Sequence, residues 1–82
     1  DPATLQMDYA ADAALAAADP AALVDEYDTL FMAGQMSPFM RGVLLTRLQA
    51  LLADDYGADL GLVRVQHALY LILNSPEYSI QK

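Results

Sequence analysis

The residues best suited to binding a metal ion are three aspartates in one glycine-containing stretch, Asp54, Asp55 and Asp59. Oxygen-rich loops of this kind can hold Ca²⁺. The order of the residues does not match the EF-hand pattern, and no glutamate follows at the spacing of a bidentate ligand. The other interpretation is a loop over residues 54–59 in which Asp59 caps the following helix. The three aspartates are therefore weak metal candidates, and no cofactor is predicted.

His67 is the one histidine of the chain, and Arg64 lies three residues before it. No serine or cysteine nucleophile and no second histidine can be assigned to His67 by motif. A single imidazole also falls short of a zinc ligand set, and the chain contains no cysteine. We therefore predict that His67 makes a local hydrogen bond and that no residue of the chain is catalytic.

Methionines gather where two predicted helices meet, and Phe39 lies among them. Met side chains suit adaptable binding surfaces and soft copper ligation, but they also fill cores and core rims. Both interpretations stay open on the sequence. The candidate interaction residues are Met32, Met36, Phe39 and Met40.

The charge of the chain is −7, and it is placed unevenly. Residues 1–40 contain acidic side chains but no Lys or Arg, whereas residues 41–82 contain equal numbers of both signs. This pattern disfavours binding to nucleic acid or to anionic lipid. It is compatible with a basic partner or with solubilising charge on exposed helix faces. The longest apolar run, residues 68–73, is far shorter than the ~20 residues of a membrane span.

Helix-start signals divide the chain. Asp19-Pro20 and Ser37-Pro38 each place a capping residue before a proline, which predicts helices over about 20–33 and 38–53. Gly34 is the predicted left-handed cap of the first, and the short turn between them predicts an antiparallel hairpin. An alanine-rich helix is expected over 10–18, after an irregular arm over 1–9. The expected fold is all-α, a small three-helix bundle within one domain, residues 1–82, whose helical core is 20–82.

A third main helix over about 60–74 is predicted to be central. Its apolar stripe runs through Leu62, Val65, Leu69, Ile72 and Leu73, and apolar residues continue beyond that stripe. Beyond it, Tyr78 and Ile80 are expected to fold back on the core. Apolar residues make up 56% of the chain, so the domain is either densely packed or leaves an apolar face for a partner.

Two blocks of sequence have a familiar pattern. Residues 21–38 form a leucine-containing helix followed by Gly-x-Met-Ser-Pro, and residues 64–82 read Arg-Val-x-x-Ala-x-x-Leu-x-x-x-Ser-Pro-Glu-aromatic-x-x-Gln. Together they resemble the carboxy-terminal end of a bacterial family catalogued as domain of unknown function 1800. That resemblance implies the terminal module of a longer, mostly helical protein that is periplasmic or extracellular. It supplies no catalytic residues, because none are established for the family.

The sequence favours a non-catalytic helical interaction or structural module. Its expected partner is another protein, the rest of a parent chain or a second copy of the module. The alternative is a fragment of an exported enzyme, such as a hydrolase, whose active site lies in sequence not present here.

Overall fold

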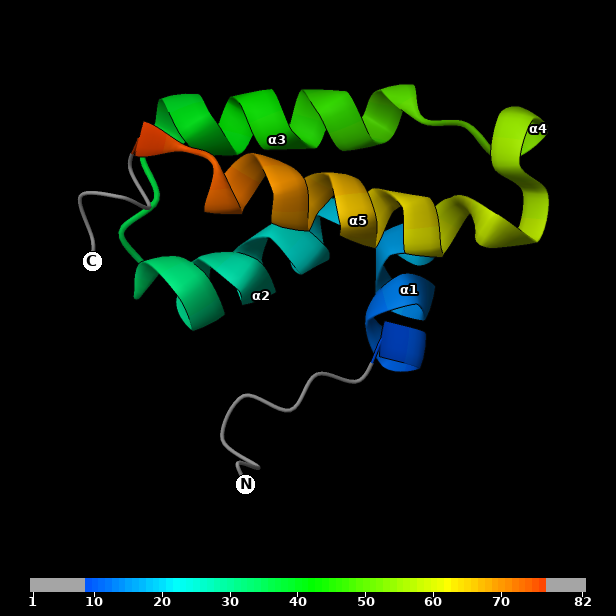
Figure 1. The fold of residues 1–82 in the computed structure, drawn as a ribbon, viewed down its shortest axis with the longest axis horizontal. Helices are drawn as coiled ribbons and strands as arrows, with labels where there is room; N and C mark the ends of the chain where they lie inside the picture. Colours follow the sequence, from blue (N-terminus) through cyan, green and yellow to red (C-terminus); the bar gives the residue numbers. More distant parts are fainter. Residues whose placement is uncertain (1–8, 77–82) are drawn as a thin grey trace.

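The computed structural model describes residues 9–76, and every regular element in this part of the chain is helical (Figure 1). The predicted all-α class is therefore confirmed. The elements are α1 (Tyr9–Ala18), α2 (Pro20–Met32), α3 (Pro38–Ala50), α4 (Ala53–Tyr56), the 3-10 turn η2 (Gly57–Asp59) and α5 (Leu60–Leu73). The predicted arm over residues 1–9 lies outside the described residues except for Tyr9, and so do Tyr78 and Ile80.

The two predicted helix starts are confirmed by their caps. The Asp19 carboxylate accepts a hydrogen bond from the Ala22 amide at 3.2 Å, and the Ser37 hydroxyl accepts one from the Met40 amide at 3.1 Å. In both helices proline takes the first turn, where its missing N–H costs nothing. Local chemistry alone therefore sets where α2 and α3 begin.

The turn between α2 and α3 differs from the prediction by one residue. Ala33, rather than Gly34, is the left-handed cap, with φ 55° and ψ 31°, and Gly34 follows with φ 77°. Two successive residues with positive φ are needed because the amides of both donate to the Asp28 carbonyl. The Asp28 carboxylate then accepts the Met36 amide at 2.9 Å, which fixes the exit toward α3.

The segment between α3 and α5 also corrects the prediction. α3 ends at Ala50 rather than near Ala53, because Leu51 and Leu52 are extended. The predicted loop over 54–59 is instead α4 followed by η2. Asp59 occupies the cap position of α5, but its side chain makes no cap hydrogen bond, because its backbone is already helical and an N-cap needs an extended one.

α5 lies between α3 and α2, and α1 crosses it steeply near its first turns (Figure 1). At the crossing a Cβ on Gly61 would collide with the backbone of Ala13, so the two helices approach as closely as main chains can. The small side chains of the alanine-rich α1 allow this close approach. The core formed by all four main helices comprises Ala16, Leu23, Val24, Tyr27, Met32, Met40, Leu44, Leu48, Val65, Ala68 and Ile72.

The buried face of α5 is rotated relative to the predicted stripe. Val65 and Ile72 are fully buried and Leu69 packs against the core, as expected. Leu62 and Leu73, however, are 41% and 47% exposed. The tight approach of α1 turns the small residues of α5 inward instead. The apolar flank of α5 that carries Leu62 and Leu73 therefore stays at the surface.

Candidate interaction surface

Among residues 9–76, Arg64 on α5 is the buried cation, only 8% exposed. Its guanidinium donates to the carbonyls of Ala16 at 2.9 Å and Ala17 at 3.4 Å, and to that of Leu51 at 2.8 Å. These carbonyls end α1 and α3, where helix dipoles favour a positive charge. Arg64 therefore fastens α5 to the ends of two helices. Sequence reasoning missed this role, although an arginine in the inward register with Gly61, Val65 and Ala68 was a usable signal.

A second buried polar contact joins α1 to α2. The Tyr27 hydroxyl donates to the Asp12 carboxylate at 2.9 Å, and Asp12 is only 8% exposed. Burial, followed by this hydrogen bond, raises the pKa of the Tyr27 phenol. The hydrogen bond with Asp12, followed by burial, raises the pKa of Glu26. Asp12, the lone polar residue within the alanine-rich run, was not identified from the sequence.

These titratable groups do not line either described depression of the surface. Acid–base catalysis needs a group within hydrogen-bond reach of a bound substrate. The polar cluster of Asp12, Glu26 and Tyr27 instead lies where α1 packs against α2. Its arrangement serves helix packing, and its proton uptake makes stability depend on pH.

The weak metal candidates are not gathered into a site. Asp54 and Asp55 lie on α4 and Asp59 in η2, all three exposed. Across residues 9–76 no group of three or more acidic or histidine side chains could hold a metal ion. A Ca²⁺-binding loop needs irregular backbone that directs several oxygen atoms toward one point. Here the backbone of this segment is helical instead. His67 is half-buried on α5, and within the described chain it lacks the predicted hydrogen bond.

Of the four interaction candidates, the structure leaves one fully at the surface. Met32 is fully buried and Met40 only 8% exposed, so the interpretation of both as interaction residues is wrong. They face inward because their helices pack against α5, and Met36 is half-buried against the same core. Phe39 is 79% exposed.

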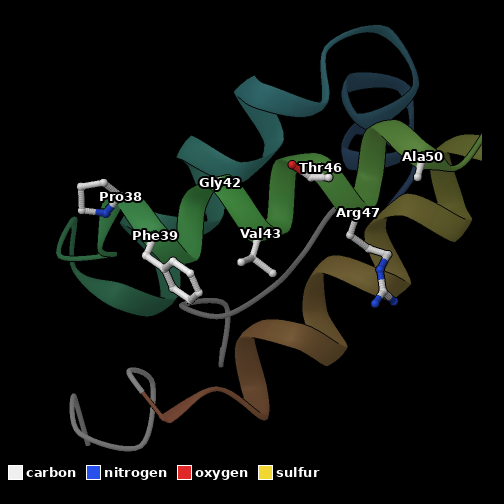
Figure 2. Close-up of a pocket in the computed structure, with 7 residues that line it drawn as sticks. All are labelled: Pro38, Phe39, Gly42, Val43, Thr46, Arg47 and Ala50. Atoms are coloured by element: carbon white, nitrogen blue, oxygen red, sulfur yellow. The ribbon is translucent and has the colours of Figure 1, made fainter.

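Phe39 begins a ridge on the outer face of α3. The side chains of Phe39, Val43 and Arg47 leave the same side of the helix, each four residues after the last (Figure 2). Beside this ridge runs a second row at the same spacing, with the smaller residues Pro38, Gly42, Thr46 and Ala50. The two rows line a shallow open depression of about 610 Å³, which we call the α3 channel.

A second depression lies on the other flank of the ridge. It has a volume of about 290 Å³, and Met40, Leu44, Leu71, Ser75 and Pro76 line it together with Phe39 and Val43. The ridge therefore stands between two hollows. An exposed aromatic residue flanked by apolar depressions is typical of a docking surface.

The charge on α3 differs from that on the acidic helices α2 and α4. α3 contains no carboxylate, and its cations are Arg41 and Arg47. Arg41 is paired with Asp25 at 3.0 Å. Arg47 is exposed beside the channel and has no ion-pair partner within residues 9–76.

Comparisons with known proteins add no relative: no family model, no curated protein and no solved structure matches the chain. No helix in the part of the chain that the structure describes has the length and apolar character to cross a bilayer. Functional interpretation therefore rests on the surface of the molecule itself.

Proposed function

We propose that this chain is a non-catalytic helical interaction module, the carboxy-terminal part of a larger exported bacterial protein. The observation that carries the proposal is the outer face of α3, where Phe39 is 79% and Val43 47% exposed beside an open channel. Leaving a phenyl side chain in water forgoes roughly 1.5–3 kcal/mol of burial. A partner that covers this face recovers that free energy.

The shape of the molecule supports the same proposal. Its principal extents are 37 × 33 × 18 Å, and packed helices are spaced about 8–10 Å apart, so the molecule is about two helix layers thick. A body this thin cannot enclose every apolar side chain of four helices. Within the described part of the chain, the large apolar residues left exposed outside α3 are Tyr9, Leu30, Leu52, Tyr56, Leu62, Tyr70 and Leu73.

Two observations support a module that has no catalytic activity. The buried polar groups are committed to helix contacts, Arg64 to carbonyl groups and Asp12 to Tyr27. The depressions beside the ridge are lined mainly by apolar side chains, together with Thr46, Arg47 and Ser75, and neither lining contains an acid–base pair. The placement outside the cytoplasm and within a longer protein rests on the resemblance to the domain of unknown function 1800 family.

The test is binding in trans. The longer gene product that ends in this sequence is identified, its upstream region is prepared alone, and binding of the labelled 82-residue chain is followed by fluorescence anisotropy. We expect saturable binding that Phe39→Ala weakens about tenfold or more. Leu62→Ala, which truncates an exposed apolar residue on α5, is the matched control and should bind as the parent chain does. Failure of the folded chain to bind, or turnover by this chain alone, would refute the proposal.

A further inference from the structure

α1 contributes less apolar packing to the fold than the other main helices do. Of its ten residues only Asp12 and Ala16 are buried, so the one fully enclosed apolar side chain of α1 is a methyl group. Leu15 packs against the core from a half-buried position. A helix of this length is marginal in water without tertiary support. The docking of α1 therefore depends on its polar contacts and on its close approach to Gly61.

The polar contact that joins α1 to α2 contains two carboxyl groups. The Asp12 carboxyl accepts the Tyr27 hydroxyl at 2.9 Å and also shares a hydrogen bond with the Glu26 carboxyl. Two carboxyl groups form a hydrogen bond only while one of them carries a proton. When that proton leaves, two negative charges face each other across the contact between the helices. Because Asp12 is only 8% exposed, water screens their repulsion incompletely.

No cation is paired with these two carboxyl groups within residues 9–76. Beside them, Tyr9 lies on α1 and Tyr27 on α2, while α5 carries Arg64 and His67 and α3 carries Arg41 and Arg47. Of these side chains, only the two tyrosines act electrostatically with the carboxyl pair. Arg64 donates to carbonyl groups, and Arg41 forms its ion pair with Asp25. The shared proton is therefore what keeps the repulsion between Asp12 and Glu26 low.

We infer that α1 docks on the rest of the fold in a pH-dependent manner, held while Asp12 and Glu26 share a proton and loosened when that proton leaves. The hydrogen bond with Asp12, followed by burial, raises the pKa of Glu26 above its ordinary value of 4.5 in the docked state. The stabilisation of docking is therefore complete below pH 4.5 and is lost as the pH rises through the raised pKa. This inference does not rest on the proposed function, because it concerns a different face of the molecule.

The connection between α1 and α2 allows α1 to move while α2 stays folded. α1 ends at Ala18 and α2 begins at Pro20, so Asp19 alone separates them. Pro20 has no N–H to donate to the Ala16 carbonyl four residues before it, so the two helices are not joined by a continuous ladder of hydrogen bonds. The Asp19 carboxylate caps α2 by accepting the Ala22 amide, and that cap does not involve α1.

Loosening of α1 changes the surroundings of α5. Gly61, which the backbone of Ala13 covers in the docked state, becomes accessible. Arg64 loses the carbonyls of Ala16 and Ala17 and keeps that of Leu51. The protonation of the carboxyl pair thus controls whether the first turns of α5 are covered.

Amide hydrogen exchange of the ¹⁵N-labelled chain between pH 4.5 and pH 7 tests the inference. Protection factors correct for the intrinsic exchange rate at each pH, and they separate local opening from global unfolding. We expect the protection of Ala16 and Ala17 on α1 to fall at least about threefold relative to that of Ile72 on α5 as the pH rises. Local opening of α1 alone produces such a change in the ratio.

Glu26→Gln and Asp12→Asn each remove one titratable carboxyl group and keep a side chain that can form hydrogen bonds. In both variants the protection of α1 relative to α5 should be independent of pH. Asp25→Asn is the matched control, because it makes the same kind of change at an exposed neighbour on α2 and should keep the wild-type pH profile. Circular dichroism checks folding, and if Asp12→Asn does not fold, the half-buried Glu26→Gln decides alone.

Three results would overturn the inference. The first is protection of α1 that does not change relative to α5 over this range of pH. The second is a Glu26→Gln variant that keeps the wild-type pH profile, and the third is an Asp25→Asn control that abolishes it. None of these results bears on binding through α3, which the Phe39→Ala comparison decides separately.

Discussion

Replacing Gly61 by alanine should destabilise the protein, because α1 and α5 meet backbone to backbone at this residue. The three atoms nearest an added Cβ are all main-chain atoms of Ala13. No side-chain rotation relieves such a contact, so α1 must move away from α5. Overpacking of this kind typically lowers the free energy of unfolding by about 1–3 kcal/mol. Alanine recovers at most the roughly 0.8–1 kcal/mol by which it exceeds glycine inside a helix.

Gly42→Ala is the matched control, because it makes the same replacement in a helix where the added Cβ meets nothing within 4 Å. For a domain of this size, 1 kcal/mol shifts the melting temperature by about 4–8 °C. We expect Gly42→Ala to raise the melting temperature by roughly 3–6 °C and Gly61→Ala to lower it by roughly 5–15 °C. Circular dichroism melts at dilute protein measure both. Two shifts of the same sign would refute the packing of α1 on α5 described above.

Three further changes probe the buried polar contacts and the strained turn. Arg64→Leu should lower the free energy of unfolding by about 3 kcal/mol in urea titrations, because it strands carbonyls that end two helices; a change under about 1 kcal/mol would contradict that role. Because the folded state raises the pKa of Glu26 above its ordinary value of 4.5, the proton bound there stabilises folding at low pH and that contribution is lost as the pH rises through the raised pKa. Glu26→Gln should therefore exceed wild type in stability at pH 7, with a gap that closes as the pH falls, and a gap independent of pH would show that Asp12 does not interact with it. Ala33→Gly should raise stability by roughly 0.5 kcal/mol, since left-handed backbone costs alanine about 1–2 kcal/mol and glycine loses part of that gain in the unfolded chain; a loss of stability would contradict the cap geometry.

Local chemistry made much of this fold predictable. Asp19 and Ser37 each precede a proline, and hydrogen bonds from side chain to backbone settle those helix starts without reference to the rest of the chain. Helix ends were less predictable. α3 stops three residues early because the Leu51 carbonyl bonds to Arg64, thirteen residues away, and no local pattern records that contact.

The rotation of α5 could not be read from its periodicity. Apolar residues cover more than one flank of this helix, so several stripes fit its sequence equally well. The choice between them is made by Gly61, where α1 comes close and turns Val65 and Ala68 inward. Leu62 and Leu73 are exposed as a consequence, although both have the residue type of a core position.

The candidate surface was only partly predictable for a similar reason. Phe39 was identified from its place at the helix hairpin, but Met32 and Met40 belong to the core. Residue type cannot separate a methionine that packs inside from one that binds a partner. Val43 and Arg47 were missed because nothing local shows that one face of α3 stays uncovered. A row of small residues beside a row of large ones was the available signal.

The most direct test of the outer face of α3 as a docking surface is a residue-resolved map of association. Amide spectra are recorded for the ¹⁵N-labelled chain alone, and again with the upstream region of the parent protein. The account predicts shifts concentrated at Phe39, Gly42, Val43 and Thr46, with the α1–α5 crossing at Gly61 unchanged. Association that moves resonances at α1 or α4 and leaves those of α3 in place would contradict it.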